Sequence, residues 1–213
     1  MIEHKTISLA DQVFEHLESD ILSGKYARGE VLTESKLSAE LGVSRTPIRE
    51  ALRRLEQEHL IEDSGKGSVV IGVTEKDLED IYLIRGQLEG LVAAMAAQNR
   101  NEEQLSLLRE ALEFQEFYVG KKDADRIKQM DNKFHNRIYE LSGSMVFYDT
   151  LLPLHKKAQK YRKASLESNS RAVASVEEHR RIYEAVASGD SALAAKYANE
   201  HVQNAYNHIK RKD

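Results

Sequence analysis

Residues 32–70 read LTESKLSAELGVSRTPIREALRRLEQEHLIEDSGKGSVV, and this stretch decides the fold of the first part of the chain. Thr33 predicts the N-cap of a short helix that ends at Gly42. Ser44 predicts the cap of a second helix, and Pro47 falls in its first turn, where an amide N–H has no partner inside the helix. Because the turn between the two helices is very short, the stretch predicts a helix-turn-helix motif.

The helix that follows Ser44 has one basic face. Arg45, Arg49 and Arg53 recur at every fourth position, so they drift by only ~40° per step and share a side of the helix. Arginine is suited to bidentate contact with guanine in the major groove, and Ser44 and Thr46 can reach phosphates beside it. The alternative is an exposed helix whose arginines pair with neighbouring acidic residues. The opposite face carries the apolar residues of the core: Ile48, Leu52 and Leu55.

The sequence after this helix, LIEDSGKGSVVIGV over residues 60–73, predicts two short strands joined at Gly65 and Gly67. Such a hairpin is a β-wing. An amphipathic helix is expected over residues 9–23, and residues 25–32 are expected to form a turn. Three helices and a wing together predict a winged helix-turn-helix domain that binds DNA.

Net charge alone does not indicate a nucleic-acid partner. The whole chain carries a formal charge of -4, and residues 1–72 hold nine Lys or Arg against thirteen Asp or Glu. DNA binding requires a local basic face rather than a basic protein, however. Four of those nine basic residues fall between Arg45 and Arg54, which keeps the DNA-binding interpretation open.

The rest of the chain predicts an all-helical domain. From Thr74 onward the apolar residues follow helical spacing with few turn signals. Thr74 is expected to cap a first helix, which follows it. Further helices are expected near 102–119, 123–142, 145–166, 172–187 and 190–210. Gly120, Gly143 and Gly189 are expected to end three of them. The predicted fold class is mainly α, with the winged domain over residues 1–72 and the helical bundle over residues 73–213.

Composition excludes several classes of protein and site. The 213 residues are 41% hydrophobic and 31% charged and contain no cysteine, which removes disulfides, thiolate nucleophiles and cysteine-bound zinc. No apolar run approaches ~18 residues, and the first residues lack the pattern of a signal peptide. We therefore expect a cytoplasmic protein with no membrane partner.

One aspartate and three histidines form a candidate metal site. Asp131 and His135 lie four residues apart on a predicted helix, so both project from one face. His179 and His201 lie on the two following helices. Three histidines and a carboxylate suit zinc, nickel or manganese and leave positions for a further ligand. One alternative is that this spacing arose by chance among the eight histidines of the chain. Another is that the site belongs to a metalloenzyme and activates water, but that function would leave the basic helix and the wing unexplained.

Arg85 is a further candidate because it lies amid apolar residues of the first helix in the second domain. Drawn inward, its guanidinium can hold a carboxylate. The alternative is a surface ion pair with Glu89, one helical turn away.

The quoted stretch, and LGVSRTPIREAL most specifically, closely resembles the winged-helix domain of GntR-type bacterial transcription regulators. The helical remainder looks like the FCD effector domain of the FadR subfamily. The resemblance implies a transcription regulator, a repressor and not an enzyme, in which Arg45 and Arg49 read bases and phosphates and Lys66 and Gly67 of the wing reach the minor groove. Ser35 and Lys66 depart from the residues common in the family, which implies a different operator sequence.

For the helical domain, the resemblance implies a divalent metal, zinc first, held by the aspartate and three histidines named above. It also implies effector contacts from Arg85, Ser168 and Arg171. The expected effector is a small carboxylate such as a hydroxy acid, a sugar acid or a dicarboxylate. A homodimer would match a palindromic operator. A second expectation is that the first domain binds DNA and that the metal ion itself, rather than a carboxylate, controls this binding.

Overall fold

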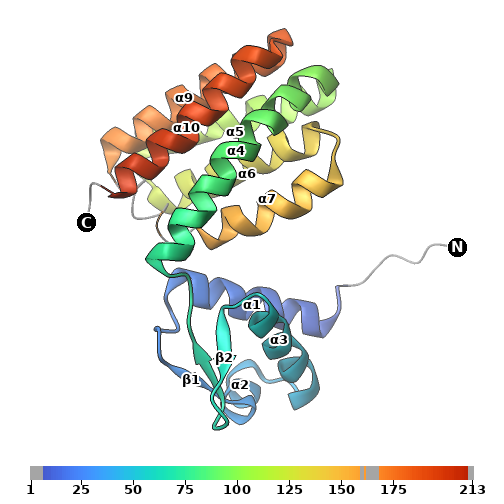
Figure 1. Ribbon diagram of the computed structural model, residues 1–213, viewed down its shortest axis with the longest axis vertical. Coiled ribbons are helices and arrows are strands. Elements are labelled where there is room, and N and C mark those ends of the chain that lie inside the picture. Colours follow the sequence, from blue (N-terminus) through green and yellow to red (C-terminus); the bar gives the residue numbers. More distant parts are fainter. Residues whose placement is uncertain (1–6, 159–160, 162–167, 211–213) are drawn as a thin grey trace, which may run out of the picture. The chain divides into compact units, whose positions relative to one another are not determined.

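The computed structural model describes residues 7–158, 161 and 168–210 (Figure 1). The chain divides into two compact units, Met1–Glu75 and Lys76–Asp213. The predicted division after residue 72 falls just before this one. No helix of the described part of the chain is long and apolar enough to cross a membrane.

The first unit is a winged helix-turn-helix. Its elements are α1 (Leu9–Ser23), β1 (Val31–Leu32), α2 (Glu34–Leu41), α3 (Arg45–Gln57), β2 (Ile61–Asp63) and β3 (Ser68–Val70). The strands form one antiparallel sheet in the order β1-β3-β2, with Ile61 opposite Val70. The three helices and the wing of the prediction are confirmed, but residues 25–32 were wrongly expected to be a turn only. Their last two residues form β1, a strand too short to show an alternating pattern.

Local contacts fix the corner between α2 and α3. The Thr33 hydroxyl accepts a hydrogen bond from the Lys36 amide, and Gly42 ends α2 in a left-handed conformation. Inside this corner the Ser38 hydroxyl donates to the Val43 carbonyl over 2.6 Å. Ile48 is fully buried on the inner side of α3. The turn therefore holds α3 with its polar face outward.

Glycine is required at the wing because the backbone there passes close to β1. Gly67 has a φ of 138°, and a Cβ at this position would lie 2.8 Å from the Leu32 carbonyl oxygen. A side chain would have to displace backbone atoms of the sheet, which explains the second glycine of the GKG sequence.

The second unit is a bundle of helices (Figure 1). They are α4 (Glu75–Asn99), α5 (Glu102–Lys121), α6 (Ala124–Leu141), α7 (Met145–Lys157), α9 (Asn169–Ser188) and α10 (Ser191–Lys210). The predicted stop at Gly120 was wrong, because α5 continues to Lys121 and Lys122 adopts the left-handed cap. Of the helix predicted over 145–166, α7 accounts for the part to Lys157, and residues 159–160 and 162–167 lie outside the described residues.

Side chains of α10 contact α4 at two glycines within the bundle. A Cβ on Gly90 would lie 2.5 Å from the Asn199 side chain, and one on Gly86 would lie 4.0 Å from Val202. The buried side of α4 continues with alanines at 93, 96 and 97. Side chains of α10, Asn199 and Val202, therefore lie over these two glycines of α4.

Candidate functional site

The outer face of α3 carries the predicted DNA contacts. Arg45, Thr46, Arg49 and Arg53 are all exposed. The guanidinium of Arg49 holds Glu34 of α2 through two hydrogen bonds, 2.7 Å from Nε and 2.8 Å from Nη2. In the free protein Arg49 therefore pairs with an acidic neighbour, as the alternative interpretation of this helix expected. An exposed pair of this kind contributes little to stability and can be exchanged for a phosphate or a base.

Two details refine the predicted surface. Ser44 occupies the predicted N-cap position of α3, but its side chain makes no capping hydrogen bond there. Arg54 belongs to the core side, because it binds Asp11 of α1 at 2.6 Å and lies over the Phe14 ring. In the wing, Lys66 is exposed next to the partly buried Gly67.

Three of the predicted metal ligands come together inside the bundle. His135 of α6, His179 of α9 and His201 of α10 are at most 4% exposed. Their ring centroids are 4.6 to 5.2 Å apart. One ring nitrogen from each lies within 4.8 Å of the others. Zinc binds histidine at about 2.0–2.1 Å, so small side-chain movements would let one ion reach all three.

Each of these histidines has its Nδ1 against a buried or largely buried protein acceptor. Nδ1 of His179 donates to Gln115 over 2.7 Å, and Nδ1 of His201 donates to Glu178 over 2.7 Å. Nδ1 of His135 lies 3.4 Å from Glu89. A histidine that donates through Nδ1 keeps its lone pair on Nε2, and metal-ligating histidines are commonly held in this way. The Nε2 atom of His135 is buried and has no hydrogen-bond partner in the described part of the chain.

Asp131 lies beside the histidines and is 2% exposed. Its Oδ1 is 3.7 Å from Nε2 of His179 and accepts a hydrogen bond from Nε2 of Gln115 over 3.4 Å. Gln115 therefore contacts two of the four predicted ligands, one through its carbonyl oxygen and one through its amide nitrogen. The fully buried position of Gln115 fixes both contacts. This set of donors fits a divalent metal ion.

Arg85 points into the bundle. It is 1% exposed, and its Nε donates to Glu89 over 2.7 Å. The ion pair with Glu89 that we weighed as a surface alternative exists, but it is buried. Glu89 also accepts a hydrogen bond from Tyr139 over 2.9 Å. Nη1 of Arg85 is buried with no hydrogen-bond partner among the described residues, so it is a donor available to a ligand.

A second set of candidate ligands adjoins the first. Glu89, His135 and His155 also offer ligand atoms within 4.8 Å of one another. His155 of α7 is buried and contacts Asn132 through Nε2 at 3.1 Å. Glu89 of this set already accepts hydrogen bonds from Arg85 and Tyr139.

Arg171 is also buried, and Glu178 connects it to the histidines. Both terminal nitrogens of Arg171 donate to Glu178, over 2.7 and 2.8 Å. The same carboxylate accepts from His201. Ser168, the third predicted effector contact, is only partly buried, and its hydroxyl lies 3.0 Å from that of Ser170.

Burial and neighbouring side chains set the pKa values of the titratable groups in this interior. Burial lowers the pKa of His201 to about 4, so the ring is neutral near pH 7. Burial alone would raise the pKa of Glu178, but hydrogen bonds from His201 and Arg171 lower it to about 2. Burial is likewise outweighed at Glu89, where Arg85 and His135 hold the carboxyl pKa well below its ordinary value. Both carboxylates are ionised.

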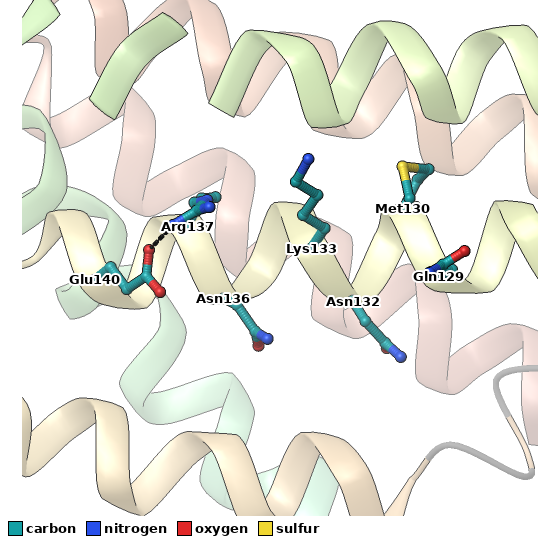
Figure 2. Close-up of a pocket in the computed structure, with 7 residues that line it drawn as sticks. All are labelled: Gln129, Met130, Asn132, Lys133, Asn136, Arg137 and Glu140. Atoms are coloured by element: carbon teal, nitrogen blue, oxygen red, sulfur yellow. Dashed lines mark hydrogen bonds and ion pairs between the residues drawn. The ribbon is translucent and has the colours of Figure 1, made fainter. Parts of the chain in front are cut away.

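A separate hollow of about 320 Å³ lies along the outside of α6. Figure 2 shows that its lining side chains come from this one helix and include the Arg137 and Glu140 ion pair. It contains none of the predicted ligands. Its lining residues are Gln129, Met130, Asn132, Lys133, Asn136, Arg137 and Glu140.

The contacts that orient the histidines were not predicted from the sequence, where Glu89 was named only as a possible surface partner of Arg85. Gln115, Glu89 and Glu178 each lie on a helix, far along the chain from at least one partner. A signal existed for Gln115, because it continues the apolar spacing of Leu108 and Leu112 on the buried side of α5. A polar residue in a buried stripe indicates a specific partner.

Comparison with known proteins is consistent with both units. Residues 9–71 match the model for bacterial regulatory proteins of the gntR family, and residues 80–204 match the FCD domain. A regulator from Bacillus subtilis strain 168, described as the uncharacterized HTH-type transcriptional regulator YdhC, is 31% identical over 93% of this chain and 90% of its own.

Two further relatives are repressors by name. The gluconate operon transcriptional repressor of Bacillus licheniformis is 39% identical, over 57% of this chain and 50% of its own. The HTH-type transcriptional repressor RspR of Escherichia coli K12 is 26% identical over 90% of this chain and 85% of its own. Among solved structures, E. coli McbR/YncC has the same fold, with a TM-score of 0.84, 24% identity and coverage of 97% and 99% of the two chains.

Proposed function

Since the chain belongs to the gntR family of bacterial transcriptional regulators and carries an FCD domain, we propose that it is a repressor controlled by a small carboxylate bound at a divalent metal ion. The observation that supports the metal is the shared arrangement of three buried histidines. Each has Nδ1 against a protein acceptor, which leaves Nε2 for an ion. Two relatives are named as repressors, which supports repression rather than activation of transcription.

In this proposal His135, His179 and His201 hold the ion through Nε2, and Asp131 adds a carboxylate oxygen. Zinc is the first expectation, with nickel and manganese as alternatives. A divalent ion bound there supplies positive charge and coordination positions for the carboxylate of the effector. Nη1 of Arg85 is a buried donor for the same ligand.

The proposed DNA contacts are Ser44, Arg45, Thr46, Arg49 and Arg53 of the helix-turn-helix, together with Lys66 and Gly67 of the wing. The exposed arginines of α3 support major-groove binding, and the open first turn of α3 suits a phosphate. A homodimer would place two such units on a palindromic operator. The effector must bind one arrangement of the dimer better than the other to change operator affinity.

The metal assignment is tested by elemental analysis of the dialysed protein beside His179→Ala and His201→Ala, with His59→Ala as control because His59 is exposed in the first unit. We expect one zinc per chain in the wild type and the control and a loss in both cluster variants. Equal metal content in all four proteins would refute the ligand assignment.

DNA binding and its control are tested together. Selection from random double-stranded DNA should recover a palindrome, and a mobility-shift titration of that palindrome should then be repeated with zinc and organic acids. If zinc alone changes operator affinity and no acid adds to it, the metal is the signal and the metal-sensing alternative replaces the effector. The family is one of regulators, so a water-activating enzyme site is not proposed.

A further inference from the structure

The ion pair between Glu34 and Arg49 joins the two helices of the helix-turn-helix. Glu34 is the first residue of α2, and Arg49 lies on the exposed face of α3. Nε of Arg49 donates to one carboxylate oxygen over 2.7 Å, and Nη2 donates to the other over 2.8 Å. The side chain of Arg49 is 68% exposed and that of Glu34 is 31% exposed, so the pair lies on the surface that is proposed to bind DNA.

These two hydrogen bonds occupy one side of the guanidinium and leave its end open. A guanidinium carries five N–H donors, one on Nε and two on each terminal nitrogen. The carboxylate takes the Nε–H and one N–H of Nη2. Among the described residues Arg49 has no other hydrogen-bond partner, so both N–H groups of Nη1 and the second N–H of Nη2 remain available. Two of these, one on each terminal nitrogen, point in parallel from the end of the side chain.

The open end of Arg49 matches the edge of a guanine. In the major groove, O6 and N7 of guanine accept two hydrogen bonds from one arginine. Arg49 can make this bidentate contact without releasing Glu34, because the two partners use different N–H groups. Without Glu34, the long side chain could turn about its single bonds and reach neighbouring phosphates instead. The ion pair therefore presents a guanidinium that is already oriented for one kind of base.

The charge of Glu34 opposes DNA binding in general. The hydrogen bond from Arg49 lowers the pKa of the Glu34 carboxyl, and the charge of Arg45 contributes, so Glu34 is ionised at neutral pH. A carboxylate among the proposed DNA contacts repels the phosphates of any sequence. Capping of α2 does not require it, because the Thr33 hydroxyl already accepts a hydrogen bond from the Lys36 amide. The contact that Glu34 makes in return is the one with Arg49.

We infer that Glu34 is a specificity residue, which holds the guanidinium of Arg49 so that its free end reads one guanine in each operator half-site. This inference rests on the proposed role of α3 in DNA binding. Glu34 touches no base in this arrangement and acts through Arg49, so it is a positioning residue. Its loss should lower the discrimination between bases rather than the affinity for DNA as a whole.

The first step of the test locates the guanine. The full-length protein is titrated with its selected operator and with operators in which one guanine of each half-site is replaced by 7-deazaguanine, which keeps O6 and base pairing but lacks N7. The N7 ratio is the dissociation constant of the replaced operator divided by that of the natural one. At one guanine we expect a wild-type N7 ratio of about ten or more, the value of a hydrogen bond from a charged group. In Arg49→Ala the N7 ratio at the same guanine should fall to about one.

The second step removes the contact with Glu34. In Glu34→Ala the N7 ratio should fall at least about threefold, less than the value of one typical hydrogen bond, while affinity for non-specific DNA stays the same or rises. Glu34→Gln keeps the size of the side chain but accepts only one of the two hydrogen bonds, so its N7 ratio should fall as well. Glu50→Ala is the matched control, because Glu50 is exposed on α3 and pairs with no arginine in the described part of the chain. Its N7 ratio should equal that of the wild type.

The outcomes separate this inference from the proposed function. If Arg49→Ala binds the selected operator as tightly as the wild type, the assignment of α3 and this inference both fail. If Arg49→Ala binds weakly but no N7 ratio depends on Arg49, the inference fails and the role of α3 stands. The same holds if folded Glu34→Ala and Glu34→Gln keep the wild-type ratio, or if Glu50→Ala loses it equally. A purely structural role of Glu34 would weaken binding to every operator alike and leave the ratio unchanged. Circular dichroism checks the fold of each variant.

Discussion

Gln115 offers the sharpest test of how the histidine cluster is held. The side chain contributes a carbonyl oxygen to Nδ1 of His179 and an amide N–H to Asp131, and it is fully buried. Replacing it with leucine keeps most of the volume and removes both contacts. His179 is then free to rotate or to place its proton on Nε2, the atom that the proposed site requires for the metal.

The size of the effect follows from these two contacts. Loss of a residue that orients a metal ligand typically lowers metal affinity by about 10- to 100-fold. That range corresponds to roughly 1.4–2.8 kcal/mol, and it agrees with the cost of about 1–3 kcal/mol for leaving one buried donor without an acceptor. We therefore expect Gln115→Leu to weaken zinc binding by one to two orders of magnitude, although it changes none of the four proposed ligands.

The assay is competition for zinc against a chromophoric chelator, on the full chain with circular dichroism as a folding check. Gln115→Glu is the informative second variant. It retains an acceptor for His179 but places a like charge against Asp131, so the two contacts can be separated. Wild-type zinc affinity in a folded Gln115→Leu protein would refute the positioning role. Histidine tautomers measured by NMR in the metal-free protein should show Nε2 protonation of His179 only in the leucine variant.

Three further predictions concern DNA binding and pH. Arg49→Ala should weaken operator binding by about 1–3 kcal/mol in mobility-shift titrations with the fold intact, and unchanged affinity would contradict the assignment of α3. Lys66→Ala should reduce the salt slope of DNA binding by about one unit, and an unchanged slope would mean that Lys66 contacts no phosphate. For metal-free protein, His201 has its pKa lowered from 6.5 to about 4, so the unfolded state binds the proton first and stability should fall by roughly 3 kcal/mol between pH 6.5 and 4. Glu178, with a pKa lowered to about 2, should add a further loss only below pH 4.5, and chemical denaturation across this pH range checks both windows.

The sequence predicted what depends on local spacing. The turn at Gly42, the basic face of α3 and the glycine hairpin all follow from residues a few positions apart, and the structure contains each of them. The strand β1 was missed because its two residues pair with β3, more than thirty positions later. Lys122 rather than Gly120 ends α5, because the following Asp123 caps the next helix and requires the turn at that point.

The candidate site shows the same division between local and distant information. The pair Asp131 and His135 is visible as an i, i+4 spacing on one helix. The acceptors that orient the histidines are not, because Gln115 is 64 positions from His179 and Glu178 is 23 from His201. Likewise, sequence spacing could not distinguish a buried ion pair of Arg85 and Glu89 from an exposed one. The folded bundle decides that question, because it leaves Arg85 1% and Glu89 4% exposed.

The connection between the wing and the bundle has a mechanical consequence. β3 ends at Val70 and α4 begins at Glu75, so only four residues join the strand of the wing to the helix that carries Arg85 and Glu89. Four residues span at most about 13–14 Å even when fully extended, and a tether of that length has little slack. If the proposed effector displaces α4 when it binds Arg85, this short connection would pass the displacement along the chain to β3. Lengthening this tether with flexible residues should leave both binding events intact and uncouple one from the other.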